Sequence, residues 1–109
     1  MIDTHAHLYL CEPSLKDLVT QASEAGLTHI INIGVNIDTS LQALESHTQY
    51  PHMIYPTIGI HPCESPPETD IKTLHSLVQE HPFVAIGESG LDYVKGSLSK
   101  ENRQRRILF

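Results

Sequence analysis

Two histidines in the first stretch of the chain, His5 and His7, have the residue type and the spacing to bind a metal ion. Residues 1–8 are predicted to form a β-strand, in which alternate side chains share a face, roughly 7 Å apart along the backbone. Two imidazole nitrogens could then reach one cation at about 2.0–2.1 Å, provided that other ligands complete its coordination. The pair by itself is equally compatible with two polar side chains at a solvated strand end.

Glu88 is the second candidate, because it follows residues 83–87, an apolar stretch that is expected to be a buried strand. A buried carboxylate needs a partner, since uncompensated burial is strongly unfavourable. That partner could be a metal ion or a basic side chain. Only Lys16 and Lys72 are basic among residues 1–94, so the metal ion is favoured.

The elements that position these groups alternate along the chain. Strands are expected over residues 1–8, 27–34, 53–60 and 83–87. Helices are expected between them, the first capped by Ser14 and ended by Gly26, the second capped by Asp38-Thr39-Ser40, and the third running from Pro67 to Pro82. Strict alternation with apolar strands predicts an α/β fold with a parallel sheet covered by helices.

In such sheets the binding and catalytic groups collect at the carboxyl ends of the strands. His61 follows the strand expected over residues 53–60, so His5, His7, His61 and Glu88 are expected to share one rim. The remaining histidines are expected to be structural or solvated.

Composition bounds the function. Seven basic residues against thirteen acidic ones give a net charge of −6, and five of the seven basic residues lie after residue 94. A nucleic-acid-binding protein normally has a broad basic face, so a protein of this charge that handles phosphate would need bound cations. No signal peptide or apolar span of about 20 residues is evident, which predicts a cytoplasmic protein without a membrane partner. Cys11 and Cys63 are expected to be free thiols.

Three motifs together resemble the TatD-like metal-dependent hydrolases: residues 2–8 (IDTHAHL), 59–62 (GIHP) and 86–93 (IGESGLDY). The resemblance implies an amidohydrolase-like (β/α)₈ TIM barrel, one or two divalent ions (Mg, Mn or Zn) and a deoxyribonuclease that cleaves DNA phosphodiester bonds with metal-activated water. Tyr9 stands where this family often has an aspartate, and Lys95 where it often has an arginine.

The same resemblance assigns roles to individual residues. It makes His5 and His7 metal ligands, Glu88 both a metal ligand and the catalytic carboxylate, and His61 a neighbour of the substrate phosphate. Asp92 and Lys95 are further substrate-binding candidates, although a turn role is equally reasonable for Asp92 and a basic cluster such as that of residues 95–106 is most often a solvated helix face.

A full barrel needs about 250 residues, so residues 1–109 are expected to be one truncated domain of about four βα units, the N-terminal half. The run from Ser99 to the last residue begins like a capped helix and ends without a cap, in keeping with truncation. The family's later ligands, two histidines and an aspartate, are absent, so weak metal binding and negligible catalysis are expected. Open sheet edges would favour self-association. The alternatives are an amidohydrolase relative acting on C–N or ester bonds and a non-catalytic half barrel that binds a partner or dimerises.

Overall fold

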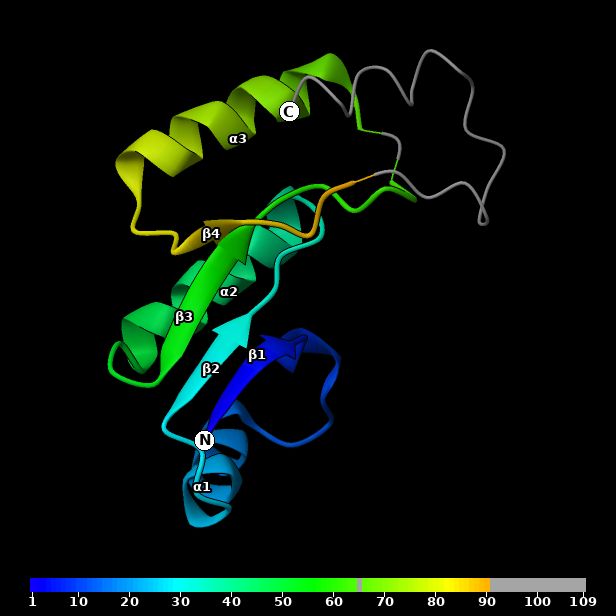
Figure 1. The fold of residues 1–109 in the computed structure, drawn as a ribbon. Coiled ribbons are helices and arrows are strands. Elements are labelled where there is room, and N and C mark those ends of the chain that lie inside the picture. Colours follow the sequence, from blue (N-terminus) through cyan, green and yellow to red (C-terminus); the bar gives the residue numbers. More distant parts are fainter. Residues whose placement is uncertain (65, 91–109) are drawn as a thin grey trace.

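The chain alternates between strands and helices in the computed structural model, which describes residues 1–64 and 66–90 (Figure 1). The elements are β1 (Ile2–Ala6), the short 3₁₀ helix η1 (Leu8–Leu10), α1 (Leu15–Glu24), β2 (His29–Asn32), α2 (Ile37–Gln49), β3 (Ile54–Ile58), α3 (Glu68–Glu80) and β4 (Ala85–Ile86). Asp92, Lys95 and the helix expected at the end of the chain lie outside the described residues.

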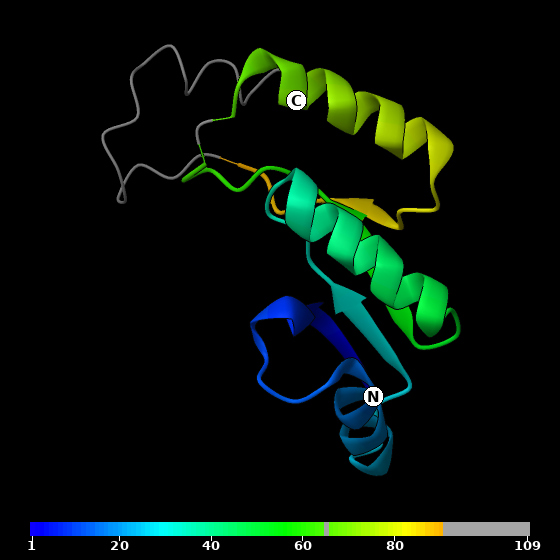
Figure 2. The same ribbon diagram turned by 180° about the vertical axis from the view of Figure 1, so that it is seen from behind.

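The four strands form one curled parallel sheet in the order β1-β2-β3-β4. Helix α2 covers one face of β2 and β3, and it lies behind the sheet in Figure 1 and in front of it in Figure 2. Helix α3 packs against the end of β3, where Leu74 of the helix forms a hydrophobic core with Ile58 and Ile60. Three βα units and a fourth strand that curl in this way form the first half of an α/β TIM barrel, as the sequence predicted.

Local signals explain where the helices begin. The Ser14 side chain accepts a hydrogen bond from the Asp17 backbone N–H (3.2 Å), and Gly26 takes the left-handed φ of +84° after α1, both as predicted. The predicted cap of α2 is wrong. Asn36 caps it in a reciprocal box with Thr39, because the Asn36 side chain accepts the Thr39 N–H (2.9 Å) while the Thr39 hydroxyl accepts the Asn36 N–H (3.1 Å).

The fourth strand differs from the buried strand expected over residues 83–87. It contains two residues, and Ile86 is 57% exposed. Its register partner Ile58, on the same face of the sheet, is 0% exposed under α3. The difference arises because β4 is an edge: no described strand or helix covers its outer flank. β1 is the opposite edge, where Ile2 is 54% exposed.

Candidate metal centre

An extra residue in β1 decides which face the two histidines occupy. Asp3 pairs with Ile30 and Ala6 pairs with Asn32, so β1 advances three residues while β2 advances two. This β-bulge puts Ala6 on the face that α2 covers, where Asn32 is buried and donates to Ser46 (3.0 Å). His5 and His7 therefore point to the opposite, open face. The strand also ends at Ala6, two residues earlier than expected, and His7 precedes η1.

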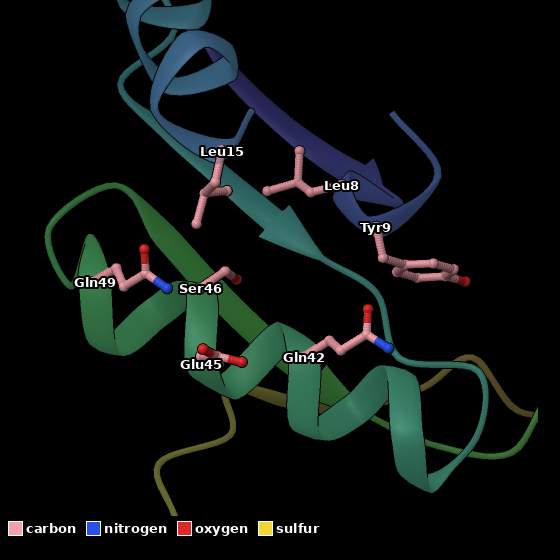
Figure 3. A pocket seen from close by; sticks show the side chains of 7 residues that line it. All are labelled: Leu8, Tyr9, Leu15, Gln42, Glu45, Ser46 and Gln49. Carbon is pink, nitrogen blue, oxygen red and sulfur yellow. The ribbon is translucent and has the colours of Figure 1, made fainter. Parts of the chain in front are cut away.

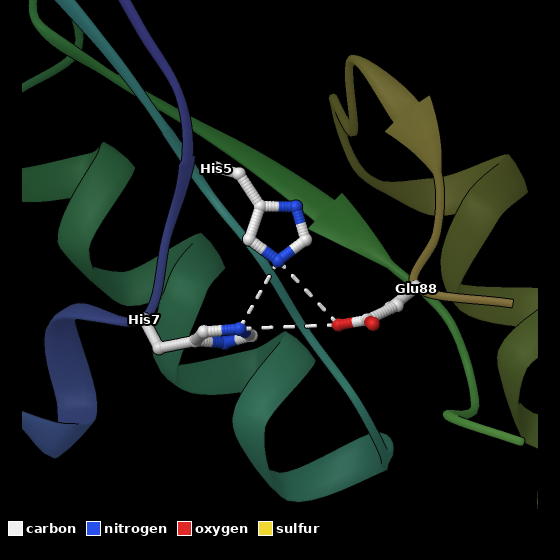
Figure 4. A group of neighbouring side chains, drawn as sticks. All are labelled: His5, His7 and Glu88. Carbon is white, nitrogen blue, oxygen red and sulfur yellow. Dashed lines mark hydrogen bonds and ion pairs between the residues drawn. The ribbon is translucent and has the colours of Figure 1, made fainter. Parts of the chain in front are cut away.

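On that face His5, His7 and Glu88 converge on one point, although Glu88 comes from the far edge of the sheet (Figure 4). The Nε2 atoms of His5 and His7 are 3.2 Å apart, and they lie 3.5 and 3.8 Å from Glu88 Oε2. Two ligand atoms about 2.1 Å from one ion are separated by about 3.0 Å at an octahedral angle and about 3.4 Å at a tetrahedral one. The spacing of these two nitrogens and one oxygen thus fits a single divalent ion with small adjustments.

The backbone around Glu88 is tied to the neighbouring strands. Its N–H donates to the Gly34 carbonyl (3.0 Å), after β2, and the Gly87 N–H donates to the Ile58 carbonyl (2.8 Å). The buried Thr57 hydroxyl donates to the Gly87 carbonyl (2.6 Å) and accepts the Gly34 N–H (3.2 Å). These hydrogen bonds fix the Glu88 backbone against β2 and β3 although β4 itself is short.

Gly59 makes this close approach possible. A Cβ atom at Gly59 would lie 2.6 Å from the Gly87 carbonyl carbon and 2.8 Å from the backbone N and O of Glu88. A Cβ atom essentially never approaches a non-bonded atom within 3.0 Å, so only glycine fits beside the Glu88 backbone.

His61 binds the second oxygen of the same carboxylate. Its Nε2 lies 3.3 Å from Glu88 Oε1, and its Nδ1 accepts the Cys63 backbone N–H (3.1 Å). Because Nδ1 is an acceptor, the ring proton sits on Nε2, which then donates to the carboxylate. His61 is therefore a hydrogen-bond donor at the edge of the site, and both of its ring nitrogens are engaged in this arrangement.

Tyr9 adds a contact that the sequence reasoning missed. Its hydroxyl lies 3.1 Å from His7 Nδ1, on the side of the ring away from Glu88. Burial raises the pKa of the Tyr9 phenol above its ordinary value, and the carboxylates of Glu88 and Glu64 raise it further. The hydroxyl consequently keeps its proton at neutral pH. The only signal in the sequence was its position two residues after His7.

A pocket of about 210 Å³ lies on the other side of Tyr9, between η1, the start of α1 and α2 (Figure 3). Its walls are Leu8, Tyr9, Leu15, Gln42, Glu45, Ser46 and Gln49. This set contains a carboxylate and two carboxamides but no lysine or arginine, so it offers no positive charge to a phosphate. The three-ligand centre, and not this pocket, has the chemistry of an active site.

The structure thus brings together four of the predicted site residues, namely His5, His7, His61 and Glu88. No lysine or arginine of the described residues pairs with Glu88, whose side-chain contacts there are with histidines. The two remaining candidates, Asp92 and Lys95, fall outside the described residues.

Two histidines and a carboxylate at the carboxyl end of a parallel half barrel are a ligand set of the kind that metal-dependent hydrolases use. The family model of TatD-related DNases matches residues 2–109, and the chain belongs to this family.

Curated relatives agree with this assignment. The 3′-5′ ssDNA/RNA exonuclease TatD of Pectobacterium carotovorum is 30% identical over 96 residues, which are 86% of this chain and 37% of that protein. The TatD exonuclease of Edwardsiella piscicida is 35% identical over 80 residues (72% and 31%), and the uncharacterized metal-dependent hydrolase YabD of Bacillus subtilis is 33% identical over 97 (85% and 38%). The chain spans between three tenths and two fifths of the length of these relatives.

Proposed function

We propose that residues 1–109 form the N-terminal half of a metal-dependent deoxyribonuclease barrel and contribute its first metal ligands. The observation that carries the proposal is the convergence of His5, His7 and Glu88, within 3.2–3.8 Å of one another, from opposite edges of the sheet. No other group of three His, Cys, Asp or Glu side chains with this spacing occurs in the described residues.

Each residue has a definite part in this proposal. The Nε2 atoms of His5 and His7 and the carboxylate of Glu88 hold one divalent ion, either Mg, Mn or Zn, and a second ion is compatible with the free capacity of the Glu88 carboxylate. When bound, the ion lowers the pKa of a water molecule and neutralises charge on the phosphate. The Oε2 atom of Glu88 faces the rings of His5 and His7, and its Oε1 atom faces the ring of His61.

His61 is suited to contact the substrate. Its Nε2–H donates to Glu88 Oε1, and we expect this donor to pass to a phosphate oxygen when the carboxylate binds a cation. The described residues contain two lysines and no arginine, so a nucleic acid is held here by the cation and by hydrogen-bond donors more than by a basic surface. Asp92 and Lys95, a few residues past Glu88, remain proposed substrate contacts.

Nucleic acid is the favoured substrate because two of the relatives described above are named as ssDNA/RNA exonucleases. The 109-residue chain has three candidate ligands and no evident general base among its described residues, so we expect weak metal binding and negligible turnover from it alone.

The decisive experiment measures hydrolysis of end-labelled single-stranded DNA, with Mg²⁺ or Mn²⁺, by the product of the full reading frame. Glu88→Gln keeps the shape but removes the charge, and we expect kcat/KM to fall at least about a hundredfold. Glu45→Gln, on α2 beside the pocket, is the matched control and should cut normally. DNA cleavage that survives Glu88→Gln would overturn the proposal, and hydrolysis of amide or ester substrates in place of DNA would support an amidohydrolase.

A second candidate, self-association of the 109-residue chain, is favoured by its open sheet edges. Ile2 in β1, Val84 just before β4 and Ile86 in β4 are 51–57% exposed. Unpaired edges with apolar side chains are places where a second chain can add. We propose that a second copy of this chain packs against these edges.

A further inference from the structure

The His7 ring is engaged at both of its nitrogens. Nε2 faces His5 and Glu88, while Nδ1 lies 3.1 Å from the Tyr9 hydroxyl. The two rings meet edge to face, with centroids 5.6 Å apart and an interplanar angle of 77°. The short helix η1 fixes this geometry, because the Leu10 N–H donates to the His7 carbonyl (3.0 Å).

The metal-free site and a metal-bound site require the ring proton of His7 on different nitrogens. A neutral imidazole carries one N–H. When Nε2 carries it toward His5 Nε2, which lies 3.2 Å away, Nδ1 is an acceptor and needs a donor. When the Nε2 lone pair is used to bind a cation, the proton must move to Nδ1, which then needs an acceptor.

A phenol hydroxyl serves both states, because it can rotate to donate or to accept at the same position. A carboxylate could only accept, and a phenylalanine ring could do neither. We propose that Tyr9 is a positioning residue that holds the His7 ring in either tautomer, so that His7 Nε2 can exchange its hydrogen bond with His5 for a cation without movement of the ring. This inference rests on the proposed metal site.

Two measurements on the 109-residue chain test the proposal. Long-range ¹⁵N–¹H NMR of the wild type should show the His7 proton on Nε2 without metal and on Nδ1 after saturation with Zn²⁺. Calorimetric titration with Zn²⁺ should show about tenfold weaker binding by Tyr9→Phe, the magnitude typical of a lost outer hydrogen bond to a ligand. Tyr50→Phe, at the end of α2 away from the metal centre, should bind like the wild type.

The Tyr9 role is refuted if Tyr9→Phe binds Zn²⁺ as tightly as the wild type, or if the His7 proton already sits on Nδ1 in the metal-free protein. The NMR result does not depend on the variant's folding. His7→Ala separates this outcome from failure of the metal site itself. If Zn²⁺ binding survives His7→Ala, the metal site is wrong; if binding depends on His7 but not on the Tyr9 hydroxyl, only the positioning role fails.

Discussion

The carboxylate of Glu88 uses its two oxygens for different partners. Oε2 faces the imidazoles of His5 and His7, and Oε1 faces His61. The side chains are partly exposed, with Glu88 at 31% and His61 at 30%, so water screens these pairs and they add little to stability. Their arrangement is better understood as a preformed ligand set than as a structural ion-pair cluster.

His61 should affect substrate binding without affecting the metal. His61→Phe removes the Nε2–H donor, and a hydrogen bond to a charged oxygen contributes about 1.5–3 kcal/mol, or roughly tenfold or more in affinity. In the active full-length protein we expect KM for single-stranded DNA to rise by about that factor, while the Mn²⁺ affinity changes less than about twofold. Steady-state kinetics and calorimetry check this. A loss of Mn²⁺ affinity comparable to that of His7→Ala would instead make His61 a metal ligand.

At the scale of elements, the site depends on how closely strand ends approach one another. Glu88 reaches the histidines because its backbone lies against Gly59 and bonds to the Gly34 carbonyl. The buried Thr57 hydroxyl joins the ends of β2, β3 and β4. A small change in this packing should therefore displace Glu88 relative to the two histidines.

Gly59→Ala tests this dependence. Its new methyl group would lie 2.6–2.8 Å from the backbone of Gly87 and Glu88, so that backbone must shift. We expect metal affinity to fall at least about tenfold, measured by Zn²⁺ titration of folded protein. Gly87→Ala is the matched control, because a Cβ there meets no atom within 4 Å, and it should keep most of the affinity. Equal affinity in both variants would show that Glu88 tolerates displacement.

At the scale of the whole molecule, the half barrel has two open edges, formed by β1 and β4. β1 and β4 each pair on one side only in the described sheet. Closing such a sheet needs more strands than these four, as eight parallel strands make the complete barrel. When the 109-residue chain is alone in solution, a second copy of the same chain can supply further strands.

Ile86→Lys should therefore weaken self-association, because a charged side chain at a strand edge opposes pairing. Sedimentation equilibrium over a range of concentrations should show the wild type associating and Ile86→Lys shifted to monomer. Leu41→Lys, at a 41% exposed site on α2, is the control for added charge and should associate like the wild type. A wild type that stays monomeric at every concentration would exclude this behaviour.

Much of this protein could be predicted from its sequence. The alternation of apolar strands and helices, the first helix cap at Ser14 and the gathering of His5, His7, His61 and Glu88 at one rim all follow from local periodicity and parallel topology. Such features depend on neighbours in sequence, or on the rule that parallel strands end together.

Tertiary structure decided the rest, because it depends on pairing between distant segments. Alternation put His5 and His7 on the same face, but the bulge against β2 chose which face. The exposure of Ile86 depends on which elements flank β4, and the donor role of His61 depends on the Cys63 N–H. The Tyr9 contact likewise exists only because η1 turns the chain back toward His7.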